Sequence, residues 1–195
     1  MSTGQWIPTA DGDTWYFDAG AESLDFASTG PVGQSPELRE TLHSPHDLGA
    51  WLAARVPTLR ADDVTERDLA DALILRGALA RLYTAAADGE AAAPDDVDTL
   101  NLFAATPDIP PALAGGRRQA GTARIRAAQA LSMLARDAIA ALGAPEGRIR
   151  RCDADDCRIV YRDESRTNSR RWCSMQRCGN RAKVRAHRER ARRRA

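Results

Sequence analysis

Four cysteines, spaced C-x4-C-x15-C-x4-C, constrain this chain more than any other feature of its sequence. They are Cys152, Cys157, Cys173 and Cys178, and all four lie in the last quarter of the 195 residues. Two close pairs separated in this way let a short hairpin bring four thiolates onto one tetrahedral ion. The sequence therefore predicts a zinc site with these ligands. Because protein would fill every coordination position, the zinc would be structural.

Three other uses of four cysteines fit this spacing less well. Structural disulfides need an oxidising compartment, whereas the first ten residues, MSTGQWIPTA, lack the charged start and apolar run of a signal peptide. Redox-active pairs typically use C-x-x-C rather than C-x4-C. An iron–sulfur cluster also takes four thiolates, but two symmetric pairs suit zinc better. No stretch approaches the roughly 18 apolar residues of a membrane span, so we expect a cytoplasmic protein.

The residues between the cysteine pairs suggest how the zinc-binding segment folds. Residues 158–161 (RIVY) predict a strand, residues 163–168 a polar turn, and residues 170–173 (RRWC) a returning strand. Ser174 can cap a helix that carries Cys178 in its first or second turn. A knuckle, a hairpin and a helix with the last ligand together resemble a treble-clef finger.

The net charge of +1 hides a division between the two ends of the chain. From Arg148 onward there are 17 arginines and lysines against 6 acids, a net charge of +11, and the preceding residues carry −10. Such asymmetry indicates nucleic-acid binding, or contact between a basic and an acidic part.

The helix expected after Ser174 is almost entirely basic. At 100° per residue, five arginines share one narrow stripe next to Cys178, namely Arg177, Arg181, Arg185, Arg188 and Arg192. A core cannot hold such a helix along its length, and a phosphate backbone would relieve the repulsion between its charges. We therefore predict that it binds double-stranded DNA, with Asn180 or Arg181 reading bases. The predicted nucleic-acid contacts are Arg170, Arg171, Arg177, Asn180, Arg181, Lys183, Arg185 and Arg188.

Arg170 and Arg171 alternate across the predicted returning strand, so only one of them can share a face with the stripe. The other would pair with Asp153, Asp155 or Asp156.

Other interpretations of the basic helix stay open. It could be a solvated, frayed tail, or it could pack on the acidic N-terminal part of this chain or of a second copy. The finger could also dock on a protein or RNA partner instead of DNA. The spacing yields no nucleophile with a base and no open metal site, so we do not expect an enzyme.

The residues before the finger predict a mostly helical domain. Residues 14–29, TWYFDAGAESLDFAST, predict a small β-hairpin about Ala19-Gly20, with Trp15, Phe17, Leu24 and Phe26 pointing inward. Helix start and stop signals and apolar spacing then predict four helices, over residues 44–55, 65–89, 95–105 and 124–142.

Two stretches resemble a known family. The run RIRRCDADDCRIVYRDESRTNSRRWCSMQRCGNRAKVRAHRERA closely resembles the CGNR-type zinc finger of bacterial transcription regulators, with Cys178-Gly179-Asn180-Arg181 as the signature. In that family the finger follows an ABATE domain, described as a stress-induced regulator. SLDFAST followed by HSPHDLGAWLAAR resembles the opening of that domain, although Ser28 stands where the family usually has Asn. The resemblance implies the four cysteines as zinc ligands, and DNA binding as a family-level expectation.

These observations predict an α+β protein with two domains. Residues 1–147 would form the ABATE-like domain, mostly helical with a small β-hairpin, and residues 148–195 a treble-clef-like zinc finger with its basic helix. We expect a transcription regulator whose N-terminal domain senses a small molecule or forms a homodimer, because one short finger reads few base pairs.

Overall fold

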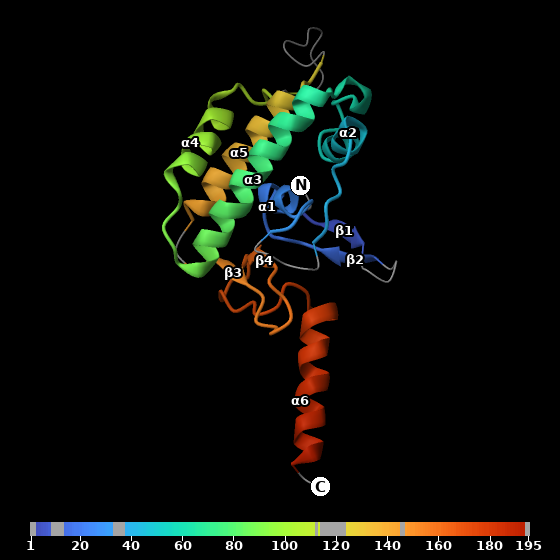
Figure 1. Ribbon diagram of the computed structural model, residues 1–195, viewed down its shortest axis with the longest axis vertical. Coiled ribbons are helices and arrows are strands. Elements are labelled where there is room, and N and C mark those ends of the chain that lie inside the picture. The colour runs from blue at the N-terminus through green and yellow to red at the C-terminus, as the bar shows by residue number, and fades with distance from the viewer. Residues whose placement is uncertain are drawn as a thin grey trace.

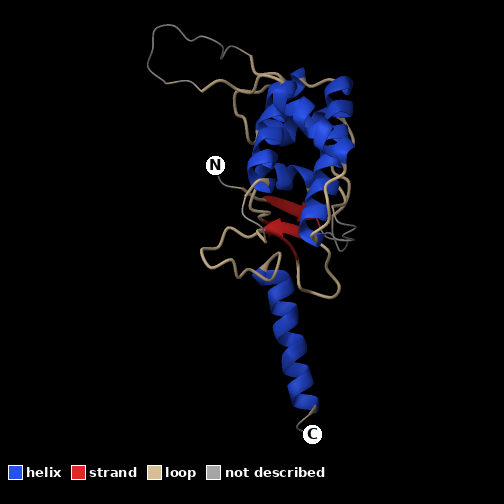
Figure 2. Ribbon diagram, turned by 90° about the vertical axis from the view of Figure 1, so that its left-hand side faces the viewer, coloured by secondary structure: helices blue, strands red, loops and turns tan. Residues whose placement is uncertain are grey.

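The computed structural model describes residues 3–8, 14–32, 38–111, 113, 124–144 and 147–193. These residues form a helical body, a small cysteine-bearing finger beside it and one helix that projects from the finger (Figures 1 and 2). The helices are α1 (Glu22–Ala27), α2 (Pro45–Ala53), α3 (Glu66–Asp88), α4 (Pro94–Ala105), α5 (Ala127–Leu142) and α6 (Asn180–Arg192), with the short turns η1 (Ala61–Asp63) and η2 (Met175–Gly179). The strands form two antiparallel hairpins, β1 (Gln5–Pro8) with β2 (Thr14–Phe17) and β3 (Ile149–Arg151) with β4 (Val160–Arg162). The predicted α+β, mostly helical fold class with a C-terminal finger is confirmed.

Local signals start and end the helices of the body as the sequence predicts. The side chain of Ser44 accepts a hydrogen bond from the amide of Asp47 (3.3 Å) at the start of α2. A capping box between Thr65 and Asp68 begins α3, and Gly89 ends it with a left-handed φ of 71°. The third predicted helix is confirmed as α4.

The fourth predicted helix is confirmed as α5, but it begins at Ala127 rather than Arg124. Ile125 forms a parallel bridge with Leu59, and the side chain of Arg124 pairs with Asp63 (2.8 Å). These contacts hold the chain extended until the helix starts.

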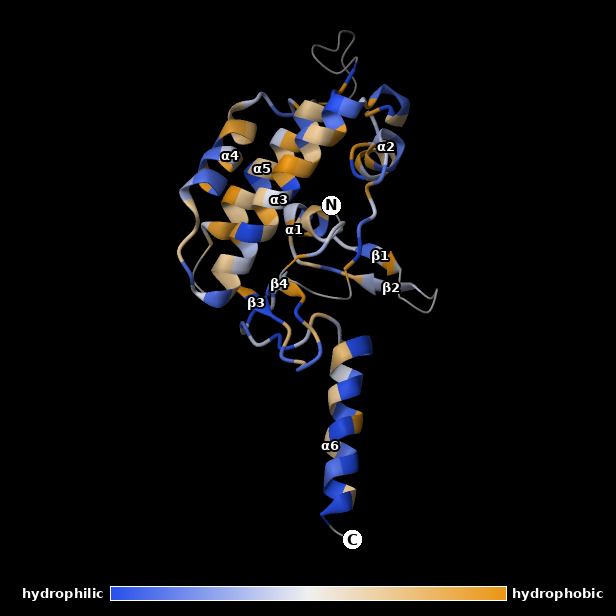
Figure 3. Ribbon diagram, viewed as in Figure 1, coloured by the Kyte–Doolittle hydropathy of each residue, from blue (hydrophilic) through white to orange (hydrophobic). Residues whose placement is uncertain are grey.

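Helix α1 lies at the centre of the body, where it contacts both α3 and α5 (Figure 1). Leu24 and Phe26 of this helix are fully buried, as are Leu75 and Leu79 of α3 and Leu131 of α5. Apolar and hydrophilic residues are interspersed along the long helices (Figure 3), and most of the apolar residues of α3 and α5 are buried against this core. The short helix is thus enclosed by the elements that follow it in the chain.

The predicted strand pairing of the first hairpin is wrong. Strand β2 pairs with β1, in the register Gln5↔Phe17 and Ile7↔Trp15, and the second apolar run is helix α1. Residues 23–27 are all buried, so the alternation of apolar and polar residues that marks a half-buried strand does not apply there. The amide of Asp25 donates to the carbonyl of Ala21 (2.9 Å) and closes the helical turn. Phe17 is buried and Trp15 is partly buried, as expected of inward residues.

The predicted returning strand of the finger is also wrong. Strand β4 pairs with β3, in the register Ile149↔Arg162 and Arg151↔Val160, and residues 170–173 form no strand. The backbone of residues 170–173 makes isolated hydrogen bonds instead of the regular series between paired strands. The amide of Arg170 donates to the carboxylate of Asp163 (2.8 Å), and the carbonyl of Arg171 accepts from the amide of Asp153 (2.9 Å).

The finger packs tightly against the body. The amide of Arg162 donates to the carbonyl of Ala19 (2.7 Å), which follows β2. The Nη2 of Arg151 donates to the carboxylate of Asp88 (2.6 Å) at the end of α3. Tyr161 of β4 is fully buried in the same apolar cluster as the helices. Body and finger therefore share one continuous core.

Substitutions at two glycines test this contact. At Gly20 (φ +81°) a Cβ would lie 2.5 Å from the carbonyl oxygen of Arg162, whereas at Gly89 (φ +71°) it would meet open space. We expect G89A to lower the free energy of unfolding by about 1–2 kcal/mol, the penalty of a left-handed L-residue. G20A should cost more, because the finger must also move away. Urea unfolding followed by circular dichroism measures both, and equal costs would contradict a close fit between hairpin and finger.

Candidate metal centre and basic helix

The four cysteines predicted as ligands meet at one point of the finger. Cys152 follows β3, Cys157 precedes β4, Cys173 precedes η2, and Cys178 lies within η2. All four side chains are buried, with 0–6% of their surface exposed. Their sulfur atoms all lie within 4.8 Å of one another. Cysteines that are up to 26 positions apart in the chain thus form a single cluster.

The spacing of the sulfurs fits a tetrahedral zinc ion and does not fit disulfides. The Sγ of Cys173 lies 3.8 Å from that of Cys157 and 3.5 Å from that of Cys178. Four thiolates at about 2.3 Å from zinc would be about 3.8 Å apart, whereas a disulfide bond is about 2.05 Å long. Four protein ligands leave no coordination position for a substrate, so the arrangement suits a structural ion.

The sulfurs of the cluster exchange hydrogen bonds, which lower the pKa of some of the thiols and raise the pKa of Cys157 and Cys173. Hydrogen bonds from the thiols of Cys157, Cys173 and Cys178 hold the pKa of Cys152 far below its usual range. The backbone amide of Cys173 also donates to the Sγ of Cys152 (3.4 Å).

The loop between the first two cysteines, residues 153–156, carries three acids that pair with arginines. Asp153 accepts from Arg171 (2.8 Å), one of the pairs that the sequence predicts for the arginine off the helix stripe. Asp156 pairs with Arg181 (3.1 Å), and Asp155 pairs with Arg185.

The contact of Asp155 and Asp156 with helix α6 was not predicted from the sequence. The signal was present in CDADDC, because two acids beside a cysteine that must approach the basic helix will meet its nearest arginines.

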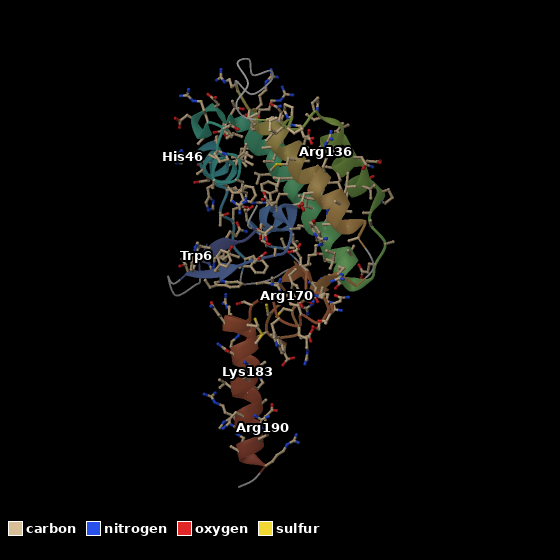
Figure 4. The ribbon with its side chains drawn as sticks, turned by 180° about the vertical axis from the view of Figure 1, so that it is seen from behind. Trp6, His46, Arg136, Arg170, Lys183 and Arg190 are labelled. Atoms are coloured by element: carbon tan, nitrogen blue, oxygen red, sulfur yellow. The ribbon has the colours of Figure 1, made fainter. Side chains whose placement is uncertain are left out.

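Helix α6 stands alone beyond the finger. Apart from its ion pairs with the loop 153–156, it packs mainly on η2, none of its described residues is buried, and it projects away from the body (Figures 1 and 2). The acidic helical body therefore does not cover it in this chain. Most of its length is hydrophilic, and Lys183 and Arg190 extend from it into solvent (Figures 3 and 4). One side forms a shallow, open groove lined by Arg177, Arg181, Val184, Arg185, Arg188 and Arg192, which places the five stripe arginines together.

Other predicted nucleic-acid residues lie around the base of the helix. The guanidinium of Arg177 lies over the ring of Trp15 in β2 (4.9 Å to the centroid). The side-chain amide of Asn180 donates to the carbonyl of Gln176 (3.1 Å), although the residue is exposed. Arg171 is also exposed.

Arg170 instead faces the interior, at the junction of body and finger (Figure 4). Its guanidinium lies over the ring of Tyr161 (4.2 Å to the centroid) and donates to the carbonyls of Asp18 (2.9 Å) and Trp172 (3.0 Å).

The fold and the cluster define a class of protein, a helical domain joined to a finger with a four-cysteine metal site. Residues 148–191 match the family described as "CGNR zinc finger", and residues 20–145 match the ABATE family, described as "Putative stress-induced transcription regulator". The second match covers more than half of the chain, and the chain belongs to the ABATE family. A comparison with curated proteins finds no match. Within the described residues, no helix is long and apolar enough to cross a membrane.

Removal of metal tests the cysteine cluster. The chain has four cysteines, so the zinc-loaded protein should show no readily reactive thiol and should show four after treatment with a strong chelator. A colorimetric thiol reagent measures the number. C173S should lower zinc affinity by at least about 10-fold, because a neutral hydroxyl replaces a thiolate ligand, whereas S174A beside it should bind zinc as the wild type does. Four equally reactive thiols before and after chelation would contradict a metal site.

Proposed function

We propose that this protein is a zinc-containing, DNA-binding transcription regulator whose helix α6 contacts double-stranded DNA. One observation carries the proposal: a helix with no buried residue projects beyond the body and carries four arginines, Arg181, Arg185, Arg188 and Arg192, along one side. An isolated protein helix is about 10–12 Å across with its side chains, which matches the major groove of B-DNA at about 12 Å. Phosphates would neutralise charges that otherwise repel one another along the helix.

The contacts of the arginines suggest which of them serve DNA. We assign phosphate contacts to Lys183, Arg185, Arg188 and Arg192, whose side chains lie along the projecting helix. Arg185 would exchange its exposed partner Asp155 for a phosphate. Asn180, at the first turn of α6, is the candidate for reading a base edge.

Arg170, Arg171 and Arg177 stay candidates for contacts that flank the helix. Their present partners are Tyr161 for Arg170, Asp153 for Arg171 and Trp15 for Arg177. If these contacts persist on DNA, the three arginines would instead support the base of the helix.

In this proposal zinc is a structural ion held by Cys152, Cys157, Cys173 and Cys178. When bound it would tie together the loop after β3, the segment before η2 and the base of α6. The filled coordination sphere and the regulator and zinc-finger types of the two families favour regulation over catalysis.

We further propose that residues 1–147 sense a small molecule or form a homodimer, and that residues 148–195 bind DNA. A cavity of about 280 Å³ in the body supports the sensing role. It lies next to the SLDFAST stretch, and Ser28, Thr41 and Trp51 are among its lining residues. Its volume is close to the lower end for small-molecule sites, about 300 Å³. A dimer would place two fingers on one operator, which compensates for the few base pairs that one finger reads.

The salt dependence of DNA binding tests the role of α6. If about four cations contact phosphates, the plot of log K against log salt should have a slope of about −3.6 for the wild type. R188Q should weaken binding to random duplex DNA and make the slope shallower by about 0.9, because one phosphate contact is lost. Fluorescence anisotropy at several salt concentrations measures both quantities.

A matched control removes the same charge elsewhere. Arg67 is exposed in the first turn of α3, and the finger packs at the other end of that helix, about 30 Å away. R67Q should therefore bind DNA like the wild type. A flat salt response, or equal effects of R67Q and R188Q, would overturn the proposal. Tight binding to RNA or to a protein with none to duplex DNA would assign the helix to another partner.

A further inference from the structure

Arg181 stands apart from the other arginines of the stripe, because its guanidinium contacts a metal-binding cysteine. Its Nη2 donates to the Sγ of Cys178 (3.1 Å), and its Nη1 pairs with the carboxylate of Asp156 (3.1 Å). About a third of the side chain is exposed, at 37%. One planar group therefore joins the helix ligand to the loop between the first two cysteines.

The charge of the cluster explains why such a contact matters. Four thiolates around one divalent ion carry a net charge of about −2, and the sulfurs here are buried. A buried charge needs partners that donate hydrogen bonds or carry the opposite sign. The amide of Cys173 supplies a donor to Cys152. Arg181 supplies both a donor and a positive charge to Cys178, the cysteine with the least exposed surface.

The remaining residues of the Cys-Gly-Asn-Arg sequence also act within this turn. A Cβ at Gly179 would approach the side chain of Met175 to 2.9 Å and that of Trp172 to 3.3 Å. The backbone amide of Asn180 donates to the carbonyl of Met175 and closes the π-helical turn η2, and its side-chain amide donates to the carbonyl of Gln176. Arg181 follows Cys178 by three positions, which places both on the same side of the helix. The Cys-Gly-Asn-Arg run thus shapes the turn that presents Cys178 to the other cysteines.

We propose that Arg181 is a positioning residue of the metal centre, which retains the metal by fixing and neutralising the Cys178 thiolate rather than by contacting DNA. Its planar fork can bond a sulfur and a carboxylate at once, which the single ammonium of a lysine cannot do in the same geometry. This inference goes beyond DNA binding and rests on the zinc part of the proposed function.

The test compares zinc affinity among full-length variants by competition with a chromogenic chelator. R181Q should bind zinc about 10- to 100-fold more weakly, the usual effect of removing a group that supports a ligand. R188Q, on the same stripe but away from the cysteines, should bind zinc like the wild type. With Co²⁺ in place of zinc, R181Q should also shift the thiolate-to-cobalt absorption, because the thiolate loses its donor. A general loss of stability would not shift that band.

A second variant keeps the inference testable if R181Q does not fold. D156N leaves Arg181 and the four cysteines in place but removes the carboxylate that holds the guanidinium, so it should weaken zinc binding less than R181Q does. If the R181Q/D156N double variant folds, it should bind zinc as R181Q does, because D156N acts through Arg181. R181K should recover part of the affinity lost in R181Q.

The outcomes separate this inference from the proposed function. Wild-type zinc affinity and an unshifted cobalt spectrum in R181Q, with DNA affinity reduced as in R188Q, would make Arg181 a DNA contact and overturn the inference. Wild-type zinc affinity in D156N would overturn it as well if R181Q does not fold. A wild-type chain that binds no zinc would overturn the metal site itself, and the inference with it.

Discussion

The convergence of four cysteines on one point orders a segment that has few other reasons to fold. The buried apolar residues of the finger apart from these cysteines, Ile149, Ile159, Val160 and Tyr161, lie on or beside its two strands. The loop after Cys152 and the chain from residue 163 to η2 add only the partly buried Ala154 and Trp172 to this core, so their path depends largely on the cysteines that anchor them. A structural metal is a common solution for a segment too small to bury enough apolar surface. The position of α6 follows, because its base carries the fourth cysteine.

The joint between body and finger is as important as the cluster. Asp25, buried in α1, accepts hydrogen bonds from the amides of Gly4 and Ala19, and so links both strands of the first hairpin to the core. The carbonyl of Ala19 in turn accepts from Arg162 in the finger. Such a chain of contacts fixes the direction of α6 relative to the helical body. These packed elements would give the proposed sensing role a route from the body to the finger.

The charges of the finger are divided between two tasks. Close to the cysteines, acids of the loop 153–156 pair with Arg171, Arg181 and Arg185, and these pairs hold the loop against the base of the helix. Further along, Lys183 and Arg190 extend from the helix into solvent, away from the acidic loop 153–156 (Figure 4). Exposed ion pairs contribute little stability, typically about 0–1 kcal/mol, so a stronger anion can displace them. In the proposed function, the helix would thus be ordered without DNA and would exchange these partners for phosphates on binding.

The sequence alone determined the elements that rest on local chemistry. Caps at Ser44 and Thr65, the stop at Gly89 and the spacing of the cysteines gave the helices of the body and the metal cluster, because their signals lie within a few residues of their effects. Tertiary structure decided the rest. The run around Leu24 and Phe26 became a helix because the core surrounds it on every side, and β4 paired with β3 rather than with residues 170–173. The acids of CDADDC indicate pairing with the basic helix, but which arginine each acid meets depends on how the cysteines fold the chain back on itself. Contacts between residues about 25–30 positions apart leave no periodic signal in a sequence.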